Sequence, residues 1–393
     1  MKRIFVGLMS CILVTFAVLP ARGFAEEGKS GLELAKEAKS AILIEADTGK
    51  VLYAKQPDKK LPPASMTKIM TMLLIMEALN DGRLSWDEKV RTSEHAASMG
   101  GSQVFLEPGE KMTVKDMLKA IAIGSANDAS MAMAEKIGGS EEAFVKMMNE
   151  KAEKLGLQHT HFENPTGLPA ENHYSSARDM AKIARALLAY DKITEYTGKY
   201  EDYLREDTDE KFWLVNTNRL VKFYPGVDGL KTGYTNKAKF CLTATAKKDG
   251  MRVIAVVMGA DTAKARNNEV SNMLDYAFGH FQSKQIYAKG TVVETSHVDK
   301  GVMNEVPIVT ARNVSVLTKK GESVKNLDKS IVVKEHLRAP LKKGQKVGKL
   351  VLKKDGKTLS ETPLVTKTDV PRASWWNLFK HAGSFFVLPS KAH

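Results

Sequence analysis

Cysteine is scarce in this sequence of 393 residues, which holds only Cys11 and Cys241. So few cysteines exclude a disulfide-rich scaffold, and a packed core must therefore stabilise the fold. Low-complexity tracts are lacking too, and an apolar content of 43% is too high for a disordered chain. The sequence also contains no Gly-rich phosphate-binding loop. We expect Cys241, in an apparent strand over 240–246, to be a buried structural thiol.

Long apolar runs are missing as well. The run from Ile4 to Leu19 is short for a membrane span, which needs about 20 residues. It follows the cationic pair Lys2-Arg3 and precedes the small-residue segment 23–25, an order typical of a secretory signal peptide. We therefore expect cleavage after Ala25 and export of the chain, with an uncleaved anchor as the alternative. Export argues against nucleic acid as a partner.

Acidic residues are outnumbered, with 59 Lys and Arg against 46 Asp and Glu. The excess is local, because residues 283–369 carry 18 basic and 9 acidic side chains while residues 26–282 are nearly neutral. We predict a signal peptide over 1–25, a main domain over 26–282, a basic β-rich domain over 283–369 and a tail over 370–393. The basic domain is expected to attract anionic polymer or lipid. Alternatively, it only spaces the main domain from the membrane.

Strand and helix signals alternate in the main domain, which predicts an α+β fold with an antiparallel sheet flanked by helices. Hairpins expected over 41–55 and 239–259 place both ends of this domain in one sheet. The run from Met66 to Leu79 is apolar all round and predicts a buried central helix. Its methionines fit core packing better than a cofactor surface. Capping signals at Thr113 and Ser140, together with periodicity, predict four further helices, over 117–123, 140–156, 176–190 and 263–280.

The rest of the chain differs in character. Short β-rich runs around 291–293, 306–309, 314–317, 331–333 and 347–352, separated by Gly and Lys-Lys turns, predict a small β-sandwich or barrel over 283–369. In the tail, Trp375, Phe379, Ala382 and Phe386 recur at helical spacing among cationic residues. This pattern predicts an amphipathic helix that anchors the protein to the membrane surface. A helix docked on the protein itself is the alternative.

Three short patterns could carry chemistry. In Ser65-Met66-Thr67-Lys68, the serine opens the predicted central helix, where backbone N–H groups can stabilise an oxyanion. Lys68 lies on the same helical face and can take the serine proton if burial and a second cation keep its amine neutral.

The second and third patterns would complete a cleft. In Ser125-Ala126-Asn127, a hydroxyl and an amide lie on one turn, although such a pair is often only a helix cap. In Lys231-Thr232-Gly233, a cation and a hydroxyl suit a carboxylate, and the glycine lets a substrate backbone approach the strand.

The order Ser-x-x-Lys, Ser-x-Asn, Lys-Thr-Gly resembles the penicillin-recognising serine enzymes. The surrounding segments 64–68, 101–110, 164–168 and 231–235 are similar to those of the low-molecular-mass D-alanyl-D-alanine carboxypeptidases. That family is expected to share the β-rich C-terminal domain and the membrane-binding tail. Among its members, the chain looks most like the paralogues that act on spore peptidoglycan.

This resemblance implies a role for each motif residue. Ser65 would be the acyl-enzyme nucleophile, Lys68 the general base and Ser125 the proton relay to the leaving D-alanine. Asn127 would hold the substrate backbone, and Lys231 and Thr232 would bind the terminal carboxylate of the substrate. The backbone N–H groups of Ser65 and Tyr234 would stabilise the oxyanion. Gly233 would leave room for the substrate, peptidoglycan stem peptides would be the substrate class, and penicillin would be a covalent inhibitor. The family needs no cofactor or metal. Tyr234 and Ala126 depart from the family pattern, which bears on substrate preference.

Three other functions fit the sequence less well. A β-lactamase on the same fold would need a deacylating carboxylate, and no Glu-x-x-Leu-Asn stretch lies between Asn127 and Lys231. A non-catalytic wall-binding scaffold would not need the motif residues. All of them are present, which argues against a scaffold. Zinc at His159, His161 and His173 lacks a matching His-Glu-x-x-His motif, so we expect surface or structural histidines.

Overall fold

The computed structural model describes residues 31–324 and 326–374. The predicted signal peptide, Cys11 and the aromatic part of the predicted tail lie outside the described residues. Within the described part of the chain, no helix combines the length and apolar character needed to cross a membrane.

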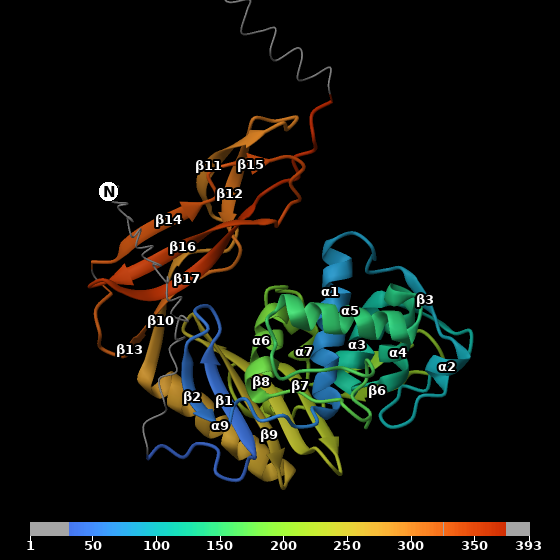
Figure 1. The fold of residues 1–393 in the computed structure, drawn as a ribbon. Helices are drawn as coiled ribbons and strands as arrows, with labels where there is room; N and C mark the ends of the chain where they lie inside the picture. The colour runs from blue at the N-terminus through green and yellow to red at the C-terminus, as the bar shows by residue number, and fades with distance from the viewer. Residues whose placement is uncertain (1–30, 325, 375–393) are drawn as a thin grey trace, which may run out of the picture. The chain divides into compact units, whose positions relative to one another are not determined.

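A five-stranded antiparallel sheet forms the centre of the first part of the chain (Figure 1). Its strands, in spatial order, are β2 (Val51–Lys55), β1 (Ser40–Glu45), β9 (Met251–Ala260), β8 (Lys239–Lys248) and β7 (Val227–Thr235). The pairing of β1 with β9 confirms the prediction that both ends of this domain enter one sheet. Strand β7 is an edge strand, so one side of its backbone is not paired within this sheet.

Both faces of the sheet are buried, which explains the nearly continuous apolar sequence of its inner strands. In β1, Ile42 and Ile44 belong to one core cluster, whereas Ala41 and Leu43 belong to the other. This alternation follows from the period of two in a strand. Cys241 on β8 is fully buried and is a free thiol, as predicted.

Helix α9 (Ala263–His280) covers one face of the sheet, and the central helix α1 (Lys68–Asn80) lies on the other side with α6 (Ala177–Leu187) (Figure 1). The four methionines at 66, 70, 72 and 76 are at most 4% exposed, which confirms core packing. Burial of each such side chain contributes about 1.5–3 kcal/mol. The helix begins with a 3₁₀ turn, η1 (Ala64–Thr67), which the apolar pattern did not predict.

Further helices and short strands lie around the central helix. The helices are α2 (Glu94–Ala97), α3 (Val114–Lys119), the π-helical turn η2 (Ala120–Gly124), α4 (Asn127–Gly138), α5 (Glu141–Lys154), α7 (Ile193–Thr197) and α8 (Leu220–Phe223). The strands are β3 (Lys89–Arg91), β4 (Lys111–Thr113), β5 (Glu201–Leu204) and β6 (Phe212–Val215). Thr113 and Ser140 cap α3 and α5 as predicted.

The chain after α9 is β-rich, as predicted. A two-stranded sheet pairs β10 (Phe281–Tyr287) with β13 (Val314–Lys319). A six-stranded sheet has the order β14 (Asp328–Val333), β16 (Lys346–Lys354), β17 (Lys357–Thr366), β12 (Glu305–Thr310), β11 (Val292–Asp299) and β15 (Leu337–Arg338). Its own apolar cluster, which includes Val306, Leu350 and Leu364, provides a separate core.

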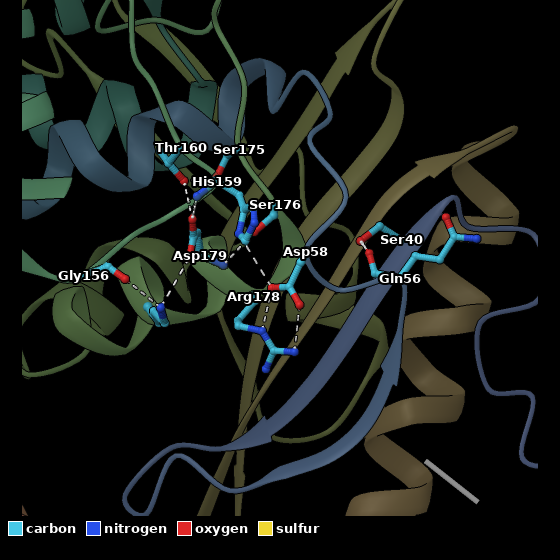
Figure 2. A network of polar contacts seen from close by, with 11 residues as sticks. Ser40, Gln56, Asp58, Gly156, His159, Thr160, Ser175, Ser176, Arg178 and Asp179 are labelled. Carbon is cyan, nitrogen blue, oxygen red and sulfur yellow. Dashed lines mark hydrogen bonds and ion pairs between the residues drawn. The ribbon is translucent and has the colours of Figure 1, made fainter. Parts of the chain in front are cut away.

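A polar network holds the segment that leads into η1 (Figure 2). The Arg178 guanidinium donates two hydrogen bonds to the Asp58 carboxylate, at 2.7 and 3.1 Å, and this pairing lowers the pKa of Asp58. Leu61 and Ser175 exchange two backbone hydrogen bonds a few residues later. Segment 58–61 is therefore fixed to the start of α6 before the chain reaches Ser65.

Candidate active site

Ser65 lies on η1, the 3₁₀ turn that precedes α1, and its side chain is half-buried. Ala64 before it has a φ of 48°, a conformation that non-glycine residues seldom adopt. Such local strain is typical of functional sites. The turn thus keeps the Ser65 hydroxyl at the end of a helix that is otherwise buried.

Lys68 is the first residue of α1 and is completely buried. Its Nζ lies 3.1 Å from Ser65 Oγ, 2.6 Å from Asn127 Oδ1 and 2.7 Å from the Thr166 carbonyl oxygen. The last two of these oxygens can only accept hydrogen bonds. The orientation of the Asn127 amide is fixed because its Nδ2 donates to the Gly100 carbonyl. A neutral amine has two hydrogens and one lone pair. When both hydrogens go to Asn127 and Thr166, the lone pair points toward the Ser65 hydroxyl.

The surroundings of Lys68 favour this neutral form. Burial lowers the pKa of Lys68 well below its ordinary value, and the neighbouring Lys231 lowers it further, while Asp128 acts in the opposite direction. Desolvation is the largest cause, because burial removes the hydration that stabilises the charged amine. Lys68 can therefore accept a proton from Ser65.

The carbonyl that binds Lys68 is presented by a tight turn at 164–168. Asn164 Oδ1 accepts hydrogen bonds from the Thr166 hydroxyl and from the backbone N–H groups of Thr166 and Gly167, at 2.7 to 3.2 Å. The neighbouring Pro165 carbonyl accepts a hydrogen bond from the Thr71 hydroxyl at 2.7 Å. This turn is thereby fixed to α1 at two points, one of which is Lys68.

Gly167 cannot carry a side chain without displacing the Ser65 turn. Its φ is +85°, and a Cβ there would lie 1.9 Å from the Ala64 carbonyl oxygen. We predict that Gly167→Ala lowers kcat/KM by at least about 100-fold and the free energy of unfolding by about 2–4 kcal/mol. Kinetics and thermal unfolding would measure both effects.

Gly156→Ala is the matched control, because its φ is +66° but no atom lies within 4 Å of the added Cβ. It should cost only about 1 kcal/mol of strain and leave kcat/KM unchanged. Equal losses of kcat/KM in both variants would contradict the steric explanation.

Ser125 and Asn127 lie where α4 begins. Ser125 follows the π-helical turn η2, has a φ of 64° and is 3% exposed. Asn127 is the first residue of α4; its N–H donates to the Ser102 carbonyl at 2.7 Å and its Nδ2 to the Gly100 carbonyl at 2.6 Å. The predicted turn is present, and it connects the segment 100–102 to Lys68 through one amide side chain.

Lys231, Thr232 and Gly233 lie on the edge strand β7, as their pattern predicted. A Cβ on Gly233 would lie 2.7 Å from the Pro63 carbonyl oxygen and 3.2 Å from the Met66 nitrogen, so β7 lies directly against the Ser65 turn. The Thr232 hydroxyl donates to Thr217 Oγ1 at 2.7 Å, and Lys231 Nζ lies 3.4 Å from the same oxygen.

Lys231 is also buried, and this changes its titration. Burial lowers the pKa of Lys231 to about 7, with a further contribution from Arg266. Lys231 is thus the second cation that sequence reasoning placed near Lys68. At neutral pH, an approaching carboxylate would favour its charged form.

Tyr234 contributes a different kind of group. Its side chain is 52% exposed, its hydroxyl donates to Asn236 Oδ1 and its ring packs on Phe240 at 4.5 Å. The contacts of the Tyr234 side chain are therefore with Asn236 and Phe240 and not with the motif residues. The Tyr234 backbone, in contrast, continues β7 directly after Gly233. The sequence analysis likewise assigned it a backbone role.

Sequence reasoning missed four groups around these residues. The resemblance singled out segment 164–168, but the role of the Thr166 carbonyl oxygen was missed, because a backbone group leaves no side-chain pattern. The buried Asp128 accepts hydrogen bonds from the N–H groups of Val104 and Leu106 and so holds the neighbouring segment. The sequence could have indicated Asp128, because it directly follows Asn127 of the second motif. Thr217 and Arg266 come from distant parts of the sequence and approach Lys231 only in the folded chain.

The three histidines are separated by their partners. Nδ1 of the buried His173 accepts a hydrogen bond from the Glu163 N–H, so its Nε2 carries the proton and donates to Thr67 Oγ1 at 2.8 Å. His161 contacts Glu163, and His159 lies 3.8 Å from Asp58. In residues 31–324 and 326–374 no three His, Cys, Asp or Glu side chains are grouped to hold a metal ion.

A cavity of about 280 Å³ opens beside the Ser65 turn. Its walls come from the segment before Ser65, the turn after Thr166 and the end of β7 (Pro62, Pro63, Ala64, Gly167, Leu168, Pro169, Ala170, Glu171, His173, Thr235 and Lys237). The cavity borders Ala64, the residue before Ser65, but none of the side chains of Ser65, Lys68, Ser125, Asn127 or Lys231 lines it.

Family models and a curated relative match the chain. Residues 27–262 match the family described as D-alanyl-D-alanine carboxypeptidase, and residues 281–372 match the C-terminal domain of penicillin-binding protein 5. The chain is 58% identical over 381 residues to D-alanyl-D-alanine carboxypeptidase DacF of Bacillus subtilis, covering 97% of both chains.

Two solved structures extend the comparison. Penicillin binding protein 5 from Haemophilus influenzae is similar with a TM-score of 0.66 and 31% identity, covering 86% of this chain and 98% of that one. Penicillin-binding protein D2 from Listeria monocytogenes, in an ampicillin-bound form, has a TM-score of 0.56 and 31% identity, covering 62% of this chain and 98% of its own. The predicted family and fold class are confirmed.

Proposed function

The chain belongs to the D-alanyl-D-alanine carboxypeptidase family of serine-type hydrolases, and we propose that it removes the terminal D-alanine from peptidoglycan stem pentapeptides through an acyl-enzyme on Ser65. One observation carries this proposal. Lys68 Nζ lies 3.1 Å from Ser65 Oγ. The same nitrogen donates hydrogen bonds to Asn127 Oδ1 and to the Thr166 carbonyl oxygen. That arrangement is a general base aimed at a nucleophile.

Acylation follows from this geometry. Ser65 Oγ attacks the carbonyl carbon of the penultimate D-alanine, and the hydroxyl proton passes to Lys68 Nζ. The oxyanion is stabilised by the N–H groups of Ser65 and Tyr234. Its collapse breaks the C–N bond, and the leaving amine receives its proton through Ser125.

Deacylation reuses the same base. A water molecule attacks the ester carbon while Lys68 accepts its proton, and the Ser65 oxygen leaves as the hydroxyl. The products are the shortened stem peptide and free D-alanine. Asn127 holds the peptide backbone during both steps.

The terminal carboxylate of the substrate distinguishes a carboxypeptidase site from a general peptidase site. We assign it to Lys231 and Thr232, with the buried Arg266 as the further cation, since Arg266 already acts on the pKa of Lys231. Gly233 lets β7 lie against the Ser65 turn rather than making room for the substrate itself, and the edge of β7 that is unpaired in its sheet is available to the substrate backbone.

Penicillin would enter the same chemistry as a covalent inhibitor. Attack by Ser65 opens the β-lactam amide and leaves an ester whose former leaving group stays attached. The ampicillin-bound Listeria relative supports this proposal. The missing Glu-x-x-Leu-Asn stretch argues against rapid hydrolysis of that ester.

The setting of the enzyme is part of the proposal. The signal peptide over 1–25 would export it, the catalytic domain would span 26–282 and the basic domain 283–369, and the tail over 370–393 would anchor it to the outer face of the membrane. Spore peptidoglycan is the proposed target, on the resemblance to the sporulation paralogues.

Release of D-alanine tests the function. The purified protein from residue 26 onward is expected to release D-alanine from diacetyl-L-Lys-D-Ala-D-Ala and to be labelled by fluorescent penicillin. Labelling without release would favour a non-catalytic scaffold. Rapid turnover of penicillin would favour a β-lactamase.

A further inference from the structure

Three segments meet at one end of the six-stranded sheet and form what we call the basic tip. They are the loop 299–303, the segment 338–343 and the segment 369–373. Backbone hydrogen bonds of 2.8 to 3.0 Å join them (Ala339 to Asp299, Val302 to Pro371, Ala373 to Lys300, and Leu341 with Val370 in both directions). Figure 1 shows the last described residues leaving the sheet at the end where β11 and β15 lie.

The tip exposes two apolar side chains on a fixed loop. Val302 is 45% exposed and Met303 is 44% exposed. Between them and β11, Gly301 is buried, and a Cβ there would lie 2.6 Å from the Met303 carbonyl oxygen. The close packing of Gly301 and the hydrogen bond from the Val302 N–H to Pro371 fix the backbone, so both side chains are held outward.

Basic side chains outnumber acidic ones in the segments that carry this apolar pair. The three segments hold five exposed basic side chains (Lys300, Arg338, Lys342, Lys343 and Arg372) and two carboxylates (Asp299 and Asp369). An exposed apolar pair on a tip with an excess of exposed cations matches the boundary between anionic headgroups and acyl chains. An anionic wall polymer would attract the cations but would gain nothing from Val302 and Met303.

The sequence places a second apolar group next to the tip. Ala373 is hydrogen-bonded to Lys300, and Trp375 and Trp376 follow within three residues. Any surface that receives these tryptophans lies within a short chain length of Val302 and Met303.

We propose that the basic tip is itself a membrane-docking surface, with Val302 and Met303 entering the headgroup boundary of an anionic phospholipid bilayer and the five cations facing lipid phosphates. The docking adds to any anchoring by the tail and does not depend on peptidase activity. It orients the folded β-rich domain, which a tail alone would leave free to rotate.

Site-specific fluorescence tests the contact. In the protein from residue 26 onward, Met303→Cys would be labelled with an environment-sensitive fluorophore, since Cys241 is fully buried and unreactive in the folded protein. The matched control is Val332→Cys on β14, 49% exposed at the opposite edge of the same sheet. With phosphatidylcholine and phosphatidylglycerol vesicles, emission from position 303 should shift to the blue and position 332 should not. Unshifted emission at 303 in vesicle-bound protein would overturn the proposal.

Affinity provides a second readout. Val302→Ser with Met303→Ser, and separately Lys342→Glu with Lys343→Glu, should each weaken vesicle binding roughly five- to tenfold or more. The control pair, Ile331→Ser with Val332→Ser, should not change it. All three variants alter exposed side chains, so thermal unfolding should stay unchanged. A different outcome would be binding of the protein to poly(glycerol phosphate) together with unchanged vesicle binding by the Val302→Ser, Met303→Ser variant. That outcome would overturn the proposal and would identify an anionic wall polymer as the ligand of the tip.

Discussion

Replacing Ser65 by alanine is expected to reduce the rate of D-alanine release by at least about 10⁴-fold, because the variant lacks the atom that forms the acyl-enzyme. The half-buried side chain is small, so the variant should fold with unchanged thermal unfolding. Steady-state release of D-alanine from diacetyl-L-Lys-D-Ala-D-Ala measures the effect. Binding of the substrate carboxylate should persist, because Lys231 and Thr232 remain.

The outcome that would contradict this prediction is retained activity. If Ser65→Ala keeps more than a few per cent of the wild-type rate, another nucleophile carries the reaction. Ser85→Ala, which changes an exposed serine away from the described contacts of Lys68, should behave like the wild type.

The second large effect is expected at Lys68. Glutamine at this position keeps two N–H groups for Asn127 Oδ1 and the Thr166 carbonyl but has no basic lone pair for Ser65. Lys68→Gln should therefore lower the rates of acylation and deacylation by roughly 10³-fold or more while preserving the fold. Lys119→Gln is the matched control, since Lys119 is also a buried lysine but is bonded to Asp202 and the Tyr203 carbonyl. Near-wild-type acylation by Lys68→Gln would exclude Lys68 as the base.

The pH profile follows from the two lysines. Lys68 must be neutral, so kcat/KM should rise as pH increases through its lowered pKa. Lys231 must be charged to bind the carboxylate, so kcat/KM should fall as pH rises through about 7 in the free enzyme. Bound carboxylate favours the charged lysine, so the corresponding fall in kcat should lie at higher pH. A basic limb at the same pH in both profiles would contradict the role of Lys231.

Much of the fold was predictable because its signals are local. The Asp47-Thr48-Gly49 turn, the caps at Thr113 and Ser140 and the all-apolar central helix each depend on a few neighbouring residues. The one-sheet arrangement followed from strands at both ends of the domain. Strand β17 was missed because its alternation is interrupted by Pro363 and charged residues on an exposed face.

The site was predictable only in part, and the reason is physical. Side chains such as Ser65, Lys68 and Lys231 carry their chemistry in their identity, so spacing and order could reveal them. The Thr166 carbonyl belongs to a backbone that any residue has. Arg266 approaches Lys231 through the packing of α9 on the sheet, a long-range contact that no short motif records.

The most direct test of the account is to find where penicillin attaches. The purified protein would be treated with benzylpenicillin, digested, and its peptides measured by mass spectrometry. We expect one penicilloyl group on the peptide that contains Ser65, located at that residue by fragmentation. An adduct on a different residue, or no adduct in protein that releases D-alanine, would contradict it.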